Sequence, residues 1–162
     1  MSAGKVGDAA TMPDFPPLEA RSLNGRAYRL PGELEGENNV VIVGFEWWQQ
    51  ELIDSWVPSL AALAASRPGL RFYELVAVPR SRLPVRRVID GGMVAGIRDR
   101  EVRARTLTTY TDLGELLVAL DLGSTQDIAI FLTDRAGRIR WRASGAHDAA
   151  SPVALERTLG PG

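Results

Sequence analysis

The feature that most constrains this sequence is the stretch at residues 40–58, which passes from a strand pattern into a helical pattern. Residues 40–45 are a continuous apolar run, which is typical of a strand buried on both faces. Apolar side chains then recur at three- and four-residue spacing in Leu52, Ile53 and Trp56, which predicts an amphipathic helix. A strand that leads directly into a helix places the junction at the carboxyl end of a sheet. Proteins with alternating strands and helices usually have their functional sites at this edge.

Residues 46–51 occupy that junction and read Glu-Trp-Trp-Gln-Gln-Glu. The whole chain has no cysteine. Catalysis by a thiol, disulfide bonds and thiolate metal sites are therefore excluded. The sequence thus says more about what the junction is unable to do than about what it does.

Composition and charge place the chain among ordinary soluble proteins. It has 162 residues, of which 45% are hydrophobic and 24% charged, and a formal net charge of -1. This charge gives no general attraction to nucleic acid or to membranes. No apolar run approaches the ~18 residues that a membrane span needs. Residues 1–12 are predicted to be a disordered lead-in without a secretory signal, and residues 13–162 a single domain. A cytoplasmic location is expected.

The rest of the chain alternates between strand and helix patterns. Strands are predicted at 18–22, 27–30, 40–45, 70–78, 106–111, 128–133 and 138–143, and helices at 48–66, 113–120 and 152–159. Asn24-Gly25 is a strong signal for a hairpin turn between the first two strands. Asp112 is positioned to cap a helix, and Pro58 is expected to kink or restart the helix that contains it. The order predicts an α/β fold with a central mixed sheet flanked by helices.

Residues 80–105, called here the arginine-rich segment, interrupt this alternation. The segment contains eight arginines and only three acidic residues. One or two helices are predicted within it, broken at Gly91-Gly92 or at Gly96.

The element order, together with two short motifs, resembles the thioredoxin-like superfamily, in particular its peroxiredoxin and TlpA-type branch. The motifs are Leu23-Asn-Gly-Arg26 and the late Phe131-Leu-Thr-Asp-Arg-Ala-Gly-Arg-Ile-Arg140. Phe45 and Pro58 also have the separation found in that family. The resemblance covers residues 15–145. It implies a thioredoxin-like fold with an N-terminal β-hairpin, to which this chain adds an arginine-rich helical insert.

Two departures from the family pattern remove its redox chemistry. Counting from Phe45, the family's Cys-x-x-Cys falls on Gln50 to Ile53, where neither end residue has a redox group. The family's cis-proline falls on Ile128. A cis bond before a residue other than proline costs about 3 kcal/mol, so a trans bond is expected there. The resemblance therefore implies the frame of a thiol oxidoreductase without its activity.

A narrower similarity concerns the assembly factors for the membrane sector of mitochondrial ATP synthase. It depends on Ile139-Arg-Trp-Arg-Ala-Ser-Gly145, on the cysteine-less junction and on the inserted segment. Those proteins resemble peroxiredoxins and are regarded as chaperone-like. This similarity implies an assembly role and a protein partner.

The tryptophans have two interpretations, core packing or a recognition surface. Two adjacent tryptophans on one element do not both face inward, so Trp47 or Trp48 is expected near the surface. Interfaces favour Trp and Arg, and the start of a helix leaves backbone N–H groups free. We therefore predict a partner-binding platform at the junction. Its candidate residues are Trp47, Trp48, Gln49, Gln50 and Glu51, together with Asp127 and Ile128 before the late strand.

The arginines of the insert also have two interpretations, a solvated face or an anion-binding surface. The candidates for contact with an anionic partner are Arg80, Arg82, Arg86 and Arg87. Arginine binds carboxylates and phosphates in bidentate geometry. Nucleic acid is disfavoured, because no aromatic residues alternate with the arginines.

Other chemistry finds little support. His147 is the only histidine and is expected to be exposed, and we expect no metal site, cofactor or catalytic residue. Ser55 lies in a helix pattern without a nucleophile-elbow motif.

Three hypotheses follow from these patterns. The first is a non-redox, chaperone-like binding or assembly module. The second is an enzyme that acts on a small molecule through Glu46, Glu51 or arginine, and a pocket at the junction containing a carboxylate would favour it. The third is a structural domain that forms homo-oligomers through Met93 and Ile97.

Overall fold

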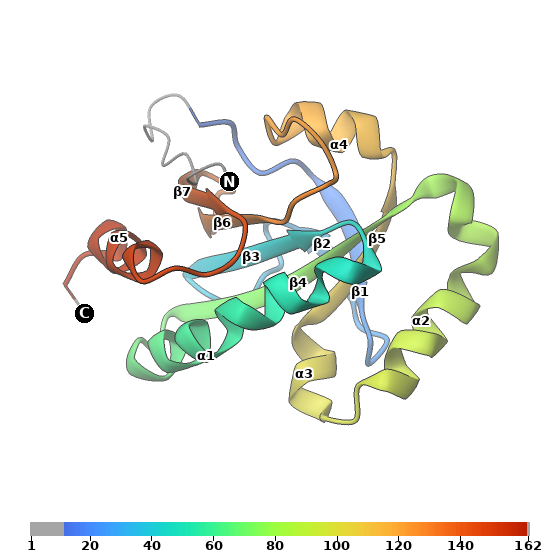
Figure 1. The fold of residues 1–162 in the computed structure, drawn as a ribbon, viewed down its shortest axis with the longest axis horizontal. Coiled ribbons are helices and arrows are strands. Elements are labelled where there is room, and N and C mark those ends of the chain that lie inside the picture. Colours follow the sequence, from blue (N-terminus) through green and yellow to red (C-terminus); the bar gives the residue numbers. More distant parts are fainter. Residues whose placement is uncertain (1–11, 162) are drawn as a thin grey trace.

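The apolar run at the start of the junction forms an interior strand of a mixed sheet (Figure 1). The computed structural model describes residues 12–161. In it, β3 spans Asn38–Gly44 and pairs with β4 (Leu70–Pro79) in parallel and with β6 (Ala129–Asp134) antiparallel. Because β3 has neighbours on both sides and helices on both faces, its apolar residues are continuous rather than alternating with polar ones.

Four further strands complete the sheet of the described residues. They are β1 (Leu18–Ser22), β2 (Ala27–Leu30), β5 (Thr106–Thr111) and β7 (Ile139–Ser144). The order is β2-β1-β5-β4-β3-β6-β7. The β1–β2 hairpin turns at Gly25, whose φ of 90° suits glycine. The predicted mixed sheet with an N-terminal hairpin is thus confirmed.

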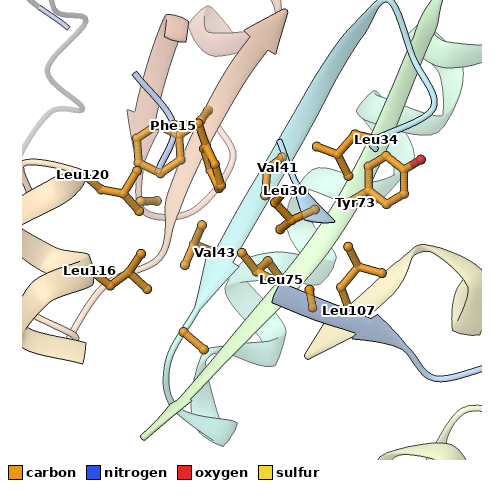
Figure 2. Packing of buried hydrophobic residues seen from close by; sticks show 14 of the residues in the cluster. Phe15, Leu30, Leu34, Val41, Val43, Tyr73, Leu75, Leu107, Leu116 and Leu120 are labelled. Atoms are coloured by element: carbon orange, nitrogen blue, oxygen red, sulfur yellow. The ribbon is translucent and has the colours of Figure 1, made fainter. Parts of the chain in front are cut away.

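Alternate residues of β3 supply two hydrophobic cores. Val41 and Val43 face a core that includes Phe15 and the two leucines Leu116 and Leu120, which belong to α4 (Leu113–Ala119) and its end. Figure 2 shows Phe15 beside Leu120, and Leu34 beside Tyr73, in this core. Asp112 caps α4 as predicted, its carboxylate accepting a hydrogen bond from the Glu115 N–H at 2.9 Å.

The opposite face of β3 packs against α1 (Gln50–Ser66) and α5 (Ala150–Leu159). Trp56 of α1 and Trp141 of β7 are each 1% exposed and meet edge to face, with ring centroids 6.2 Å apart. The indole N–H of Trp56 donates to the Gly145 carbonyl at 2.9 Å. These two tryptophans therefore follow the core-packing interpretation.

The arginine-rich segment forms a 3₁₀-helix η3 (Arg80–Val85) and the helices α2 (Arg86–Gly96) and α3 (Arg100–Arg105). Figure 1 shows α2 and α3 on the far side of α1 from α5. Helix α2 ends at Gly96, one of the two predicted breaks, and continues through Gly91-Gly92. Asp99 begins α3 by accepting a hydrogen bond from the Glu101 N–H at 2.8 Å.

Two details differ from the sequence predictions. Helix α1 does not restart at Pro58, because the residues around it pack on the sheet as one continuous helix. Strand β3 begins two residues early, because Asn38 and Asn39 pair with residues of β4 and β6. The predicted lead-in lies outside the described residues apart from Met12, which packs against the core. Over residues 12–161, no helix has the length and apolar character that crossing a bilayer requires.

Candidate functional site

The junction between β3 and α1 is a tight turn that exposes two tryptophans. A short 3₁₀-helix, η2 (Trp47–Gln49), follows Glu46 and leads directly into α1. Trp47 is 88% exposed and Trp48 44% exposed. The prediction that one of them lies near the surface is confirmed for both. Large apolar side chains presented to solvent side by side are typical of a contact surface.

The side chain of Gln49 stabilises this turn through hydrogen bonds. Its side-chain oxygen accepts hydrogen bonds from the N–H groups of Phe45, at 2.8 Å, and Glu46, at 3.1 Å. Its amide nitrogen donates to the Thr125 carbonyl at 2.8 Å, which ties the junction to the loop before β6. Gln49 is fully buried. The prediction that it contacts a partner directly is therefore wrong, because its side chain is buried and forms three hydrogen bonds inside the fold.

The two candidate residues before β6 also differ in burial. Ile128 is 1% exposed and belongs to the core, so its predicted role as a contact residue is also wrong. Its apolar side chain packs in the core on the α1 face of the sheet. Asp127 is half-buried and accepts a hydrogen bond from the Ile128 N–H at 2.8 Å. Within the described chain the one cis bond precedes Pro31, so the expected trans bond before Ile128 is confirmed.

The candidate acid–base residues of the junction lie on its outside. Glu46 and Glu51 are both exposed. The hypothesis that either acts inside a pocket is therefore wrong, because solvent surrounds both carboxylates.

His147 is not exposed as predicted but half-buried, with its ring 5.2 Å from that of Trp56. Its backbone N–H donates to the Ser55 hydroxyl oxygen at 3.0 Å. Ser55 in turn donates to the Leu52 carbonyl. The Ser55 hydroxyl is thus hydrogen-bonded to backbone groups on both sides. Ser55 and His147 therefore do not form a nucleophile–base pair.

The arginine candidates separate into free and occupied groups. Arg80, Arg82 and Arg87 are exposed. Arg86 is half-buried, pairs with Asp90 at 3.4 Å and lies over the Tyr110 ring at 5.1 Å. Burial and the hydrogen bond to Asp90 raise the pKa of the Tyr110 hydroxyl. Arg86 is thus held by its own neighbours.

A cleft of about 620 Å³ separates this part of the segment from the N-terminal hairpin. Its charged lining residues are Arg21, Arg29, Arg80, Arg86, Glu19 and Glu33. The lining thus has a net positive charge, which the two glutamates partly neutralise.

Comparison with known proteins gives a fold rather than a function. No family model and no curated protein matches the sequence. Among solved structures, a thiol:disulfide interchange protein from Bacteroides sp. is similar with a TM-score of 0.63 and 15% identity, over 93% of this chain and 91% of that one. The thioredoxin domain of a thiol-disulfide oxidoreductase from Bacteroides vulgatus is similar with a TM-score of 0.57 and 14% identity, over 99% of both chains. Copper-bound yeast Sco1 is similar with a TM-score of 0.54 and 12% identity, over 88% of this chain and 86% of that one.

The chain has the thioredoxin-like fold. The resemblance inferred from its element order is therefore confirmed, and the fold places Gln50 and Ile53 at the start of α1. Gln50 donates from its amide to the Asp54 carboxylate at 2.9 Å. Ile53 is 3% exposed and packs so closely on β3 that a Cβ at Gly44 would lie 2.9 Å from its Cδ1. An amide and a buried hydrocarbon are unable to exchange electrons, so neither position supplies thiol chemistry.

The structure adds one residue that the sequence interpretation missed. Glu74 lies in the middle of β4, in register with Ile42 of β3, and faces the α1 side of the sheet. Its Oε1 is buried and has no hydrogen-bond partner among residues 12–161. A charged residue inside an otherwise apolar strand was the available signal. Met93 and Ile97, which were candidates for an oligomer interface, line a cavity beside Glu74.

Proposed function

We propose that this protein is a non-redox binding or assembly module, chaperone-like in character, whose β3–α1 junction contacts a protein partner. The observation that carries the proposal is the pair of exposed tryptophans on η2. The exposed part of a Trp side chain buries no area on folding, whereas in interfaces Trp is among the residues whose loss weakens binding most. The proposal is also supported by position, because this pair lies just before Gln50, on which the resemblance puts the first residue of the family's redox motif.

The turn is also suited to binding because it is rigid. Gln49 fixes its backbone through three hydrogen bonds, so little conformational freedom is lost when a partner binds. Trp47 and Trp48 form the centre of the proposed surface, with Gln50 and Glu51 at its rim. A cytoplasmic location stays a prediction from the sequence.

The test replaces Trp47 and Trp48 together with alanine and compares partner capture with that of the wild-type protein. Val118 is 82% exposed on α4, on the other face of the sheet, and Val118→Ala is the matched control. We expect captured partner to fall at least ~10-fold in the double variant and to stay unchanged in the control. A photo-crosslinking residue at position 47, but not at position 118, should then form an adduct with that partner. Equal capture by all three proteins would refute the proposal.

We further propose that the exposed arginines of η3 and α2 attract an acidic region of the same partner. Charges at the rim of an interface act mainly on the rate of association. Replacing Arg80, Arg82 and Arg87 with glutamate should therefore slow association and remove most of its dependence on salt. The control is Arg135→Glu, at an exposed position in the β6–β7 turn. An unchanged salt dependence in the triple variant would exclude a role for these arginines.

A further inference from the structure

A cavity of about 570 Å³ lies between α1, β4 and the helices α2 and α3. Most of its wall is apolar, with Ile53 and Val57 from α1, Phe72 from β4, and Met93 and Ile97 from α2 and its end. This volume is in the range of small-molecule sites, which combine apolar walls with a few polar groups. Trp47 and Trp48 do not line the cavity, although Gln50, at the rim of their surface, does.

Glu74 is the polar group on the β4 wall of this cavity. The register of β3 and β4 places it opposite Ile42, which also lines the cavity. Its Oε1 is out of contact with solvent and accepts no hydrogen bond from residues 12–161. A buried carboxylate oxygen without a donor is unfavourable, so the position is stabilised by any occupant that donates to it.

The other charged side chains that line the cavity leave it with more negative than positive groups. From α1, Asp54 brings a second carboxylate, which accepts from the Gln50 amide. From the end of α3, Arg105 brings one guanidinium, which lies over the Phe72 ring at 4.7 Å from its centroid. The cavity is thus lined by two carboxylates, of which that of Asp54 is exposed to solvent, and by one guanidinium, which is engaged with an aromatic ring.

We propose that this cavity is a binding site for a small organic cation, a protonated amine carried on an apolar or aromatic body. The ammonium would donate to Glu74, and the body would contact Met93, Ile97 and Phe72. Thioether–aromatic contacts favour an aromatic ligand beside a methionine. An anionic ligand would meet two carboxylates, and a neutral apolar one would leave Oε1 without a partner.

The proton balance of Glu74 agrees with this ligand class. Burial raises the pKa of the Glu74 carboxyl. Hydrogen bonding from the Gln50 side chain and the positive charge of Arg105 oppose the increase, and the Asp54 carboxylate adds to it. Charge pairing with an ammonium would lower that pKa again, so binding of the amine should release a proton from the site and tighten as pH rises through it.

Methionine methyl resonances provide a direct test on the full chain. Met93 lines the cavity, whereas Met12 packs in the core on the opposite face of the sheet and is an internal control. The probes are 2-phenylethylamine, 2-phenylethanol and phenylacetate, which share a body and differ in charge. We expect 2-phenylethylamine to shift the Met93 signal without moving that of Met12, and to bind at least ~10-fold more tightly than the other two.

Three variants complete the test. Glu74→Gln preserves shape and removes one acceptor, and should weaken 2-phenylethylamine about 10-fold while leaving 2-phenylethanol unchanged. Ile97→Trp should fill the cavity and abolish the Met93 shift for every probe. Glu115→Gln, at an exposed site on α4, is the matched control and should change nothing.

The proposal is overturned if Met93 does not respond to 2-phenylethylamine, or if all three probes shift it equally. Tighter binding of phenylacetate, or undiminished amine binding in Glu74→Gln, would overturn it as well. Because the readout involves neither tryptophan of the junction nor a protein partner, its result is independent of the proposed function.

Discussion

Helix α1 has two flanks on the same face of the sheet, and they are packed in different ways. Toward β7 and α5, the side chains of Trp56, Trp141 and Leu155 are at most 1% exposed. Toward β4 and α2, the inward-facing residues Phe72 and Glu74 are only partly buried, and a cavity remains. A flank packed at the density of a protein interior stabilises the fold, whereas a flank that is left open can hold a ligand.

The chemistry of the two flanks explains the difference. α5 places a leucine against two tryptophans, which fill the space between helix and sheet. α2 contains Gly91, Gly92 and Gly96, and its Arg87 is exposed. A helix with so few large apolar residues is unable to seal the sheet beneath it.

The largest effect is expected from truncating the sealed flank. Trp56→Ala should lower the free energy of unfolding by about 3–5 kcal/mol, because a large buried side chain is removed and a void is left. Phe72→Ala on the open flank should lower it by roughly half as much, since the existing cavity already exposes the ring. Urea denaturation measures both. Equal losses would mean that the two flanks are packed alike.

The open flank should also contain a residue whose removal stabilises the protein. Glu74→Leu replaces a carboxylate with an unpaired buried oxygen by an apolar side chain, and should raise the free energy of unfolding by about 1–3 kcal/mol. Glu115→Leu, at an exposed position, is the control for added hydrophobicity. A Glu74→Leu variant that unfolds more easily than the wild type would show that the carboxylate is paired in solution.

The pH dependence of stability follows from the same residue. Burial raises the pKa of Glu74 above its ordinary value of 4.5 in the folded state, so the folded protein binds the proton more tightly than the unfolded chain. This contribution is fully present below the unfolded pKa and is lost as pH rises through the folded one. Between pH ~4 and pH ~7, stability should therefore decline more in the wild type than in Glu74→Gln. Parallel curves in the two proteins, from urea denaturation at each pH, would contradict the shift.

The smallest effect on stability is expected from the exposed tryptophan. Trp47→Ala should change the free energy of unfolding by no more than about 0.5 kcal/mol, although it removes the same side chain as Trp56→Ala. Thermal unfolding of the two variants side by side makes the comparison. A large loss on replacing Trp47 would mean that it packs on the fold and is not available to a partner.

The sequence predicted the frame well, because the frame depends on local patterns. The continuous apolar run of β3, the turn at Gly25 and the cap at Asp112 each act through residues close in the chain. Prediction was weaker where distant segments meet. Gln49 was expected at the surface, and its burial depends on Thr125, which is 76 residues away. The same holds for Glu74, since α1 before it in the chain and α2 and α3 after it together form its surroundings.

By itself, the sequence determined that this protein has a thioredoxin-like arrangement of strands and helices and that no thiol is available to act in it. Both follow from the order and identity of side chains, which no folding changes. The tertiary structure alone decided which tryptophans are core and which face solvent, and that one carboxylate oxygen of Glu74 lies buried without a hydrogen-bond partner beside a cavity. Burial depends on what the rest of the chain brings to a residue, so neighbours in sequence do not determine it.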